Sequence, residues 1–99
     1  MKTIHKIQLT MNRRTEVLLP KEFKVLKIDM QEDHPVMWIE FDSGYRVKEK
    51  ESIYLYCTGE QDIPDNRKYL GTFQTQVERC GGDYELWDNF VGHIYLEVK

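Results

Sequence analysis

The sequence predicts an all-β protein: a small antiparallel β-sandwich or open barrel of about seven strands, with little or no helix. Short runs rich in Ile, Val, Tyr and Phe recur along the chain, either wholly apolar or alternating with polar residues. Turn-forming residues separate these runs at intervals of roughly 8 to 15 positions. A chain of 99 residues has room for one core. We therefore expect one β domain over residues 1–99.

Two strands are expected within the first 20 residues. Apolar side chains alternate with polar ones over residues 7–11, and a second short apolar run covers residues 16–19. Pro20 has no backbone N–H to donate to a sheet, so it should end the second strand or lie at an edge.

A hairpin is expected over residues 25–42. Leu26, Ile28 and Met30 alternate with polar residues, which predicts a strand with these three side chains on its buried face. Residues 31–34 form the turn. Residues 35–42 are apolar at both parities, and we predict that they form the central strand, covered on both faces.

The second half of the chain predicts three more strands. Residues 45–51 carry five charges and should form a surface loop or a weak edge strand. Residues 52–57 alternate, with Tyr54 and Tyr56 on the face opposite to the aliphatic residues. We expect strands over 69–77 and 90–98, separated by a long loop over 78–89 with a glycine turn. In the last strand, His93 and Tyr95 share one face.

The sequence contains no pattern of residues that is typical of an enzyme active site. No nucleophile with a base, no carboxylate pair and no metal-ligand spacing is visible, so we expect no catalytic residue, no metal and no other cofactor. His93 and Tyr95 either line a ligand pocket or are partly buried, hydrogen-bonded residues. Tyr54 and Tyr56 form either a second aromatic patch or an ordinary outer face. Trp87 either anchors its loop or marks a binding surface.

The segment between residues 57 and 66 has two interpretations. The backbone amides at Thr58-Gly59 could hold an anion, although one glycine is a weak signal. Ile63-Pro64-Asp65-Asn66 is typical of a type I turn, which makes the segment a corner between strands.

The charge distribution and the cysteines bear on partners and compartment. The net charge is −3, yet residues 1–27 hold seven Lys or Arg against two Glu. Because no basic run exceeds two residues, a solvated surface is favoured over a nucleic-acid interface. No segment has the length and hydropathy of a membrane span or a signal peptide. Cys57 and Cys80 are expected to be reduced thiols, and an exposed Cys80 could be reactive.

Ordered motifs along nearly the whole chain resemble a known group. The most specific are Thr58-Gly59, Ile63-Pro64-Asp65 and Tyr69-Leu-Gly-Thr-Phe-Gln74. In this order they are similar to a widespread family of small bacteriophage and prophage proteins that is described as a domain of unknown function. The chain departs from the family pattern at Cys57, where a glycine is usual, and in longer segments at 60–62 and 75–89.

The resemblance implies a phage accessory protein in the host cytoplasm. It would act without catalysis, as a homo-oligomer that neutralises a host defence component, and one route is sequestration of a nucleotide-type signalling molecule. The alternatives are an inhibitor that binds a host enzyme directly and a structural or virion-associated module. Aromatic stacking together with cations for phosphate would bind a nucleotide. The candidate ligand-binding residues are Tyr54, Tyr56, Thr58, Arg67, Lys68, His93 and Tyr95.

Overall fold

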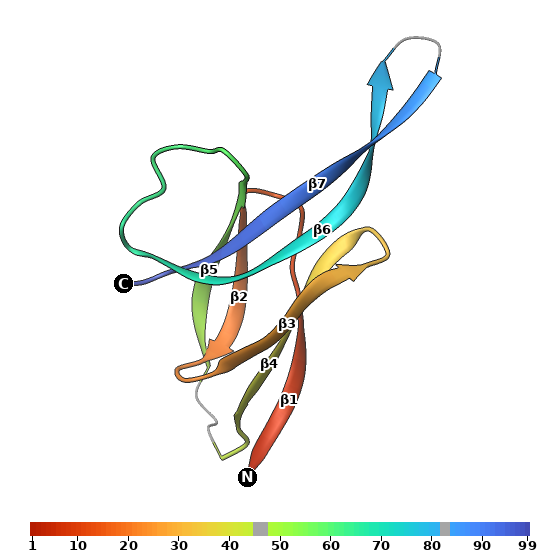
Figure 1. Cartoon of the computed structure of the whole chain (residues 1–99). Helices are drawn as coiled ribbons and strands as arrows, with labels where there is room; N and C mark the ends of the chain where they lie inside the picture. Colours follow the sequence, from red (N-terminus) through yellow and green to blue (C-terminus); the bar gives the residue numbers. More distant parts are fainter. Residues whose placement is uncertain (45–47, 82–83) are drawn as a thin grey trace.

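Seven antiparallel strands form two sheets, and the residues that the structure describes include no helix (Figure 1). The computed structural model describes residues 1–44, 48–81 and 84–99, without the side chains of residues 77–81 and 84–88. The strands do not close into a barrel, so the all-β prediction is confirmed in its open, two-sheet form. The strands are β1 (Lys2–Gln8), β2 (Arg14–Pro20), β3 (Lys24–Gln31), β4 (His34–Asp42), β5 (Lys48–Cys57), β6 (Arg67–Gly81) and β7 (Tyr84–Glu97).

The first sheet has the order β1-β4-β3, with β4 in its centre. Successive side chains of a strand point to opposite faces, yet the neighbours Val36 and Met37 are both fully buried. The central position predicted for residues 35–42 is therefore confirmed. The predicted cover on both faces is only partial, because Trp38 and Glu40, on the same face as Val36, are half-buried. The predicted hairpin is also present, because β3 and β4 pair from Lys24 with Glu40 to Gln31 with His34.

A bulge in β3 corrects the predicted face of one residue. The register between β3 and β4 shifts between Val25 and Lys27, so Leu26 has no partner in β4. An extra residue of this kind reverses the alternation on one side of it. Val25 therefore packs against the core together with Ile28, whereas Leu26 is 42% exposed. The prediction that Leu26 shares the buried face was wrong.

The second sheet has the order β2-β5-β7-β6. Its inner face contributes aliphatic side chains from every second position of β2, β5 and β7, and Phe73 from β6. Opposed to the first sheet, these residues form one core. The buried members are Leu9, Leu19, Ile28, Met37, Ile39, Phe41, Ile53, Leu55, Phe73 and Ile94.

Two glycines allow close packing in this core. A Cβ atom at Gly92 would lie 2.5 Å from the ring of Phe73, and one at Gly71 would lie 2.8 Å from Cδ1 of Ile28. Gly71 belongs to β6 and Ile28 to β3, so the second contact joins the two sheets. A larger residue at either position would push packed groups apart.

Three strand boundaries differ from the predictions. β1 covers Lys2–Gln8 rather than residues 7–11. Leu9 still donates its N–H to the carbonyl of Pro35 and its side chain enters the core, but Pro35 has no N–H to donate in return. Residues 48–51 form the first part of β5 and pair with β2, while 45–47 lie outside the described residues.

The third difference concerns residues 78–89, where the prediction of a loop was wrong. β6 continues to Gly81 and β7 begins at Tyr84, and together they form a long hairpin that projects beyond the two sheets (Figure 1). The backbone ladder of an antiparallel pair does not require apolar alternation, so a charged segment can continue it. The predicted glycine turn at 82–83 lies outside the described residues.

Candidate functional site

Two rows of side chains cross the outer face of the second sheet. Directly opposite residues on neighbouring antiparallel strands point to the same face of the sheet. The paired residues of β5, β7 and β6 therefore lie side by side on one face. The aliphatic residues between them face the core, which leaves these side chains on the outside. We name this surface the tyrosine face; its members are Tyr54, Tyr56, Tyr69, Thr72, His93 and Tyr95.

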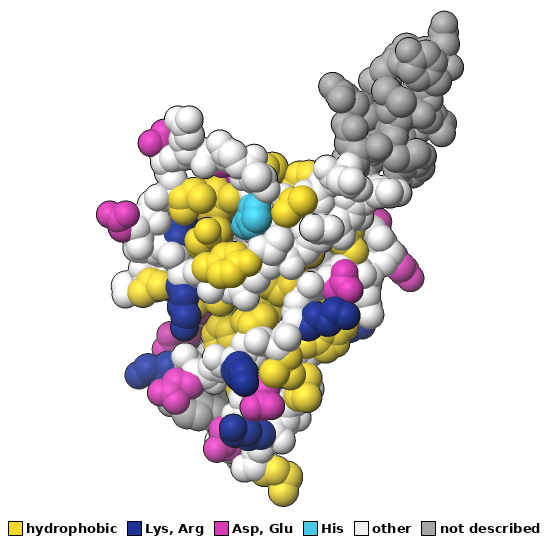
Figure 2. All heavy atoms as spheres, viewed as in Figure 1, with side chains coloured by type: hydrophobic (Ala, Val, Ile, Leu, Met, Phe, Trp, Pro, Cys, Tyr) yellow, Lys and Arg dark blue, Asp and Glu magenta, His cyan; other side chains and the backbone are white. Residues whose placement is uncertain are grey.

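The four tyrosine rings of this face touch in sequence. Tyr54 and Tyr56 are stacked with 6.2 Å between ring centroids, and Tyr95 meets Tyr56 edge-on at 5.5 Å. Tyr69 lies 5.4 Å from Tyr95 at a steep angle. Such contacts add stability beyond the area that they bury. Figure 2 shows a histidine surrounded by hydrophobic side chains over the area where β6 and β7 lie in Figure 1.

Two arginines lie over the tyrosine rings. The guanidinium carbon of Arg67 is 4.0 Å from the centroid of Tyr54, and that of Arg13 is 4.7 Å from the centroid of Tyr56. Nε of Arg67 also donates to the hydroxyl of Tyr56 at 3.2 Å. The contacts of the two guanidinium groups with the rings are cation–π interactions. Tyr56, which both arginines contact, is only 8% exposed.

His93 is held at both ring nitrogens. Its Nε2 lies 2.8 Å from the hydroxyl oxygen of Thr58, and its Nδ1 lies 3.0 Å from that of Thr72. The hydroxyl of Thr72 also hydrogen-bonds to the hydroxyl of Tyr69. The chain of polar groups from Thr58 to Tyr69 therefore holds the imidazole ring from both sides.

An ion pair fastens the segment after β5 to the tyrosine face. The guanidinium group of Arg13 makes two hydrogen bonds with the carboxylate of Glu60 and a third, of 2.8 Å, with the carbonyl of Leu55. The same carboxylate accepts the N–H of Cys57 at 2.6 Å. These donors lower the pKa of Glu60 from 4.5 to about 2, with the Arg13 hydrogen bond as the main cause.

The carboxylate of Glu60 also bears on the predicted anion-binding amides. It occupies the Cys57 amide, which is the first donor of the Thr58-Gly59 turn, so the protein supplies its own anion there. Gly59 has a φ of 91°, which explains the glycine at this position. The turn brings the hydroxyl of Thr58 to His93, and anion binding by the Thr58 and Gly59 amides stays a prediction.

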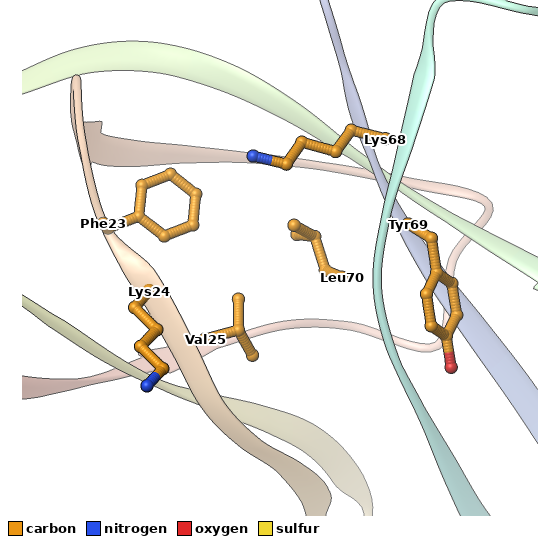
Figure 3. Close-up of a pocket in the computed structure, with 6 residues that line it drawn as sticks. All are labelled: Phe23, Lys24, Val25, Lys68, Tyr69 and Leu70. Carbon is orange, nitrogen blue, oxygen red and sulfur yellow. The ribbon is translucent and has the colours of Figure 1, made fainter.

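Most of the predicted candidates come together. Five of the seven lie on the tyrosine face or in direct contact with it through β5 and β7, and Arg67 joins them from the start of β6. Lys68 does not, because it pairs with Leu96 on the other face of the sheet. It lines a pocket of about 300 Å³ between β3 and β6 (Figure 3).

The sequence analysis did not identify Tyr69, Thr72, Arg13 or Arg14 as members of this site. Simple alternation separates Tyr69 from Thr72, but a bulge between Tyr69 and Gly71 inserts one residue and returns both side chains to the same face. Arg13 precedes β2 and carries no periodic pattern that could have identified it. Arg14 pairs with Tyr54 across β2 and β5 and donates to Ser52 at 2.8 Å.

The remaining sequence expectations concern the cysteines, Trp87, metal ligands and membrane spans. Cys57 is an exposed free thiol, whereas the side chains of Cys80 and Trp87 lie outside the described residues. Over the described residues, no group of three or more His, Cys, Asp or Glu side chains is arranged to hold a metal ion. The same described residues contain no helix that is long and apolar enough to cross a membrane.

The fold and the site define a class: an open two-sheet antiparallel β protein whose outer sheet face carries a tyrosine, histidine and arginine surface. Within that class, residues 1–98 match the family model described as a domain of unknown function, DUF7352, and the chain belongs to this family. The searches against curated proteins and against solved structures found no match.

Proposed function

We propose that this protein is a non-enzymatic binding protein that takes a nucleotide-type molecule on the tyrosine face. The observation that carries the proposal is the meeting of stacked tyrosines and arginines on one sheet surface. Proteins that bind nucleotides and single strands without catalysis use the same combination, since aromatic rings stack on bases and cations attract phosphates.

The exposed ring of Tyr69 supports stacking of a base. Its side chain is 54% exposed at the edge of the cluster, and Tyr95 supports it from one side. An aromatic side chain that is held in place loses little freedom when a ligand stacks on it. The hydroxyl groups of Tyr69 and Thr72, which His93 helps to position, can then hydrogen-bond to the edge of the base.

Two cations flank Tyr54 and support phosphate binding. Arg14 donates to the neutral Ser52 hydroxyl, and Arg67 donates to the neutral oxygens of Tyr56 and Asn66. Neither makes an ion pair with any residue of the described ranges, whereas Arg13 is neutralised by Glu60. An anionic group beside Tyr54 would thus meet two guanidinium groups that can form paired hydrogen bonds.

The environment of His93 supports binding rather than catalysis. The contact between Thr58 and Nε2 has the spacing of a nucleophile and its base. In a hydrolase, however, a carboxylate usually orients the second ring nitrogen, and here that nitrogen meets the Thr72 hydroxyl. The imidazole is therefore a positioned hydrogen-bonding group in our proposal.

Sequestration requires more surface than one sheet face offers. Small-molecule sites usually bury most of the surface of their ligand, and a tyrosine face covers one side only. We therefore include a homo-oligomer in the proposal, in which a second copy covers the other side. The resemblance to phage and prophage proteins supports the biological setting: an accessory protein in the host cytoplasm that neutralises a defence component.

The test is binding of defined nucleotides to the purified protein. Thermal shift and calorimetry with cyclic dinucleotides, cyclic ADP-ribose isomers and linear nucleotides should identify a ligand, and native mass spectrometry should show its stoichiometry and any co-purifying molecule. Arg67→Gln and Tyr69→Ala should each weaken binding about tenfold or more. Lys2→Gln, remote on β1, is the matched control. If no nucleotide shifts the melting temperature and none co-purifies, the ligand proposal fails.

The projecting hairpin favours a second candidate function, as an inhibitor that binds a host enzyme or as a virion-associated module. The β6–β7 hairpin lies beyond the two sheets and contributes to an elongated shape of 55 × 29 × 17 Å (Figure 1). Exposed backbone of this kind can add a strand to a partner. Detection in purified virions would favour the structural module, and capture of one host enzyme at equal stoichiometry would favour inhibition.

A further inference from the structure

We propose that the pocket between β3 and β6 is a separate binding site for a small amphiphilic carboxylate. The apolar part of the ligand would lie on Phe23, Val25 and Leu70, and its carboxylate would pair with the ammonium group of Lys68. This site is on the opposite side of β6 from the tyrosine face and does not depend on the nucleotide proposal.

Three of the six residues that line the pocket are apolar, and the other three are Lys24, Lys68 and Tyr69. Phe23, Val25 and Leu70 are partly buried against the core, and they face one another across a hollow of about 300 Å³ (Figure 3). This volume is at the small end of the range for ligand sites, which is about 300 to 1,000 Å³. A chain of about eight carbon atoms suits this size better than a peptide segment does.

One cation reaches over these walls. Figure 3 shows Lys68 extending toward Phe23, whereas Lys24 and Tyr69 point away from the centre. Lys68 makes no ion pair or hydrogen bond with any side chain in the described parts of the chain. A lone ammonium group above an apolar surface complements a ligand with an apolar body and an anionic head.

Two bulges form the pocket. β3 is irregular between Val25 and Lys27, and β6 is irregular between Tyr69 and Gly71. The second bulge adds Leu70 beside Gly71, so Gly71 can approach Ile28 while Leu70 turns toward Phe23. Bulges bend edge strands and redirect side chains, and they often occur next to binding sites. Here the bulge in β6 places Leu70 in the wall of the hollow.

The probe for this site is octanoate, with 1-octanol as the uncharged control. We expect octanoate, titrated into ¹⁵N-labelled protein, to shift the amide signals of residues 23–25 and 68–70. We expect Lys68→Gln to weaken its binding about tenfold, as for loss of a charge-assisted contact. Lys50→Gln, an exposed lysine on β5, should leave the affinity unchanged. 1-Octanol should bind more weakly than octanoate to the native protein and equally to the native and Lys68→Gln proteins.

Several results would overturn the proposal. They are an absence of shifts at 23–25 and 68–70, equal effects of the Lys68 and Lys50 variants, and equal affinity for octanoate and 1-octanol. A nucleotide that binds the tyrosine face should not displace octanoate. Binding of octanoate without any nucleotide binding would contradict the proposed function alone, and the reverse result would contradict this inference alone.

Discussion

Two residues that follow β5 attach this part of the chain to the tyrosine face. Glu60 and Thr58 come from the segment after β5, and each attaches this segment to a different part of the face, Glu60 through Arg13 and Thr58 through His93. The first attachment is an ion pair, and the second is a hydrogen bond between a hydroxyl group and an imidazole nitrogen.

The ion pair of Glu60 should make stability depend on acid. Its pKa is lowered from 4.5 to about 2 in the folded protein, so its contribution is fully present above pH 4.5 and is lost as the pH falls through 2. Glu60→Gln should lower the free energy of unfolding at pH 7, and the difference from the native protein should shrink steadily below pH 4.5. Denaturant unfolding at a series of pH values measures this.

A control separates this effect from general acid sensitivity. Glu16 is exposed on β2 and makes no ion pair with another described residue, so Glu16→Gln should give a small difference with little dependence on pH. A Glu60 difference that stayed constant from pH 7 to pH 2.5 would contradict the assignment.

Among the elements, alternation predicted the faces of β5 and β7 correctly and failed where a strand is irregular. Ile53 and Ile94 enter the core while Tyr54 and Tyr95 face outward, as the sequence pattern indicates. Leu26 was placed on the wrong face because β3 has a bulge that no residue type announces. Strand faces can be predicted only where the ladder is regular.

β2 offers a direct test of this alternation. Leu18 is 55% exposed and Leu19 is fully buried, although they are neighbours of the same residue type. We expect Leu19→Ala to lower the free energy of unfolding by about 2 to 5 kcal/mol, through loss of buried surface and a cavity. Leu18→Ala should change it by less than about 1 kcal/mol. Equal losses for the two variants, measured by urea unfolding, would show that the face of β2 is wrongly assigned.

For the whole molecule, the approach of the two sheets depends on small contacts between elements far apart in the sequence. Gly71 of β6 and Ile28 of β3 meet so closely that no side chain fits between them. The contact lies next to the pocket between β3 and β6. The same bulge in β6 thus sets both the sheet packing and the pocket wall.

A double-mutant cycle tests this contact. Gly71→Ala should cost about 1 to 3 kcal/mol, because its Cβ would meet Cδ1 of Ile28. Ile28→Val removes that atom and alone should cost about 0.5 to 1.5 kcal/mol. The double variant should lose clearly less than both costs together, with a coupling of at least about 0.5 kcal/mol. Gly44→Ala combined with Ile28→Val is the additive control, and additivity at Gly71 would contradict the packing.

Composition and periodicity were sufficient to predict an all-β chain of about seven antiparallel strands and its central strand. They also predicted that Tyr54 and Tyr56 share the face opposite to the aliphatic residues, and that His93 and Tyr95 share one face. These properties depend on local alternation, which each strand carries in its own residues. Long-range pairing decided the other features. It added Arg13, Tyr69 and Thr72 to the site and separated Lys68 from it. It also continued β6 and β7 through residues 77–81 and 84–88. Strand register and bulges arise from contacts between distant segments, so their geometry becomes visible only when the sheets are assembled.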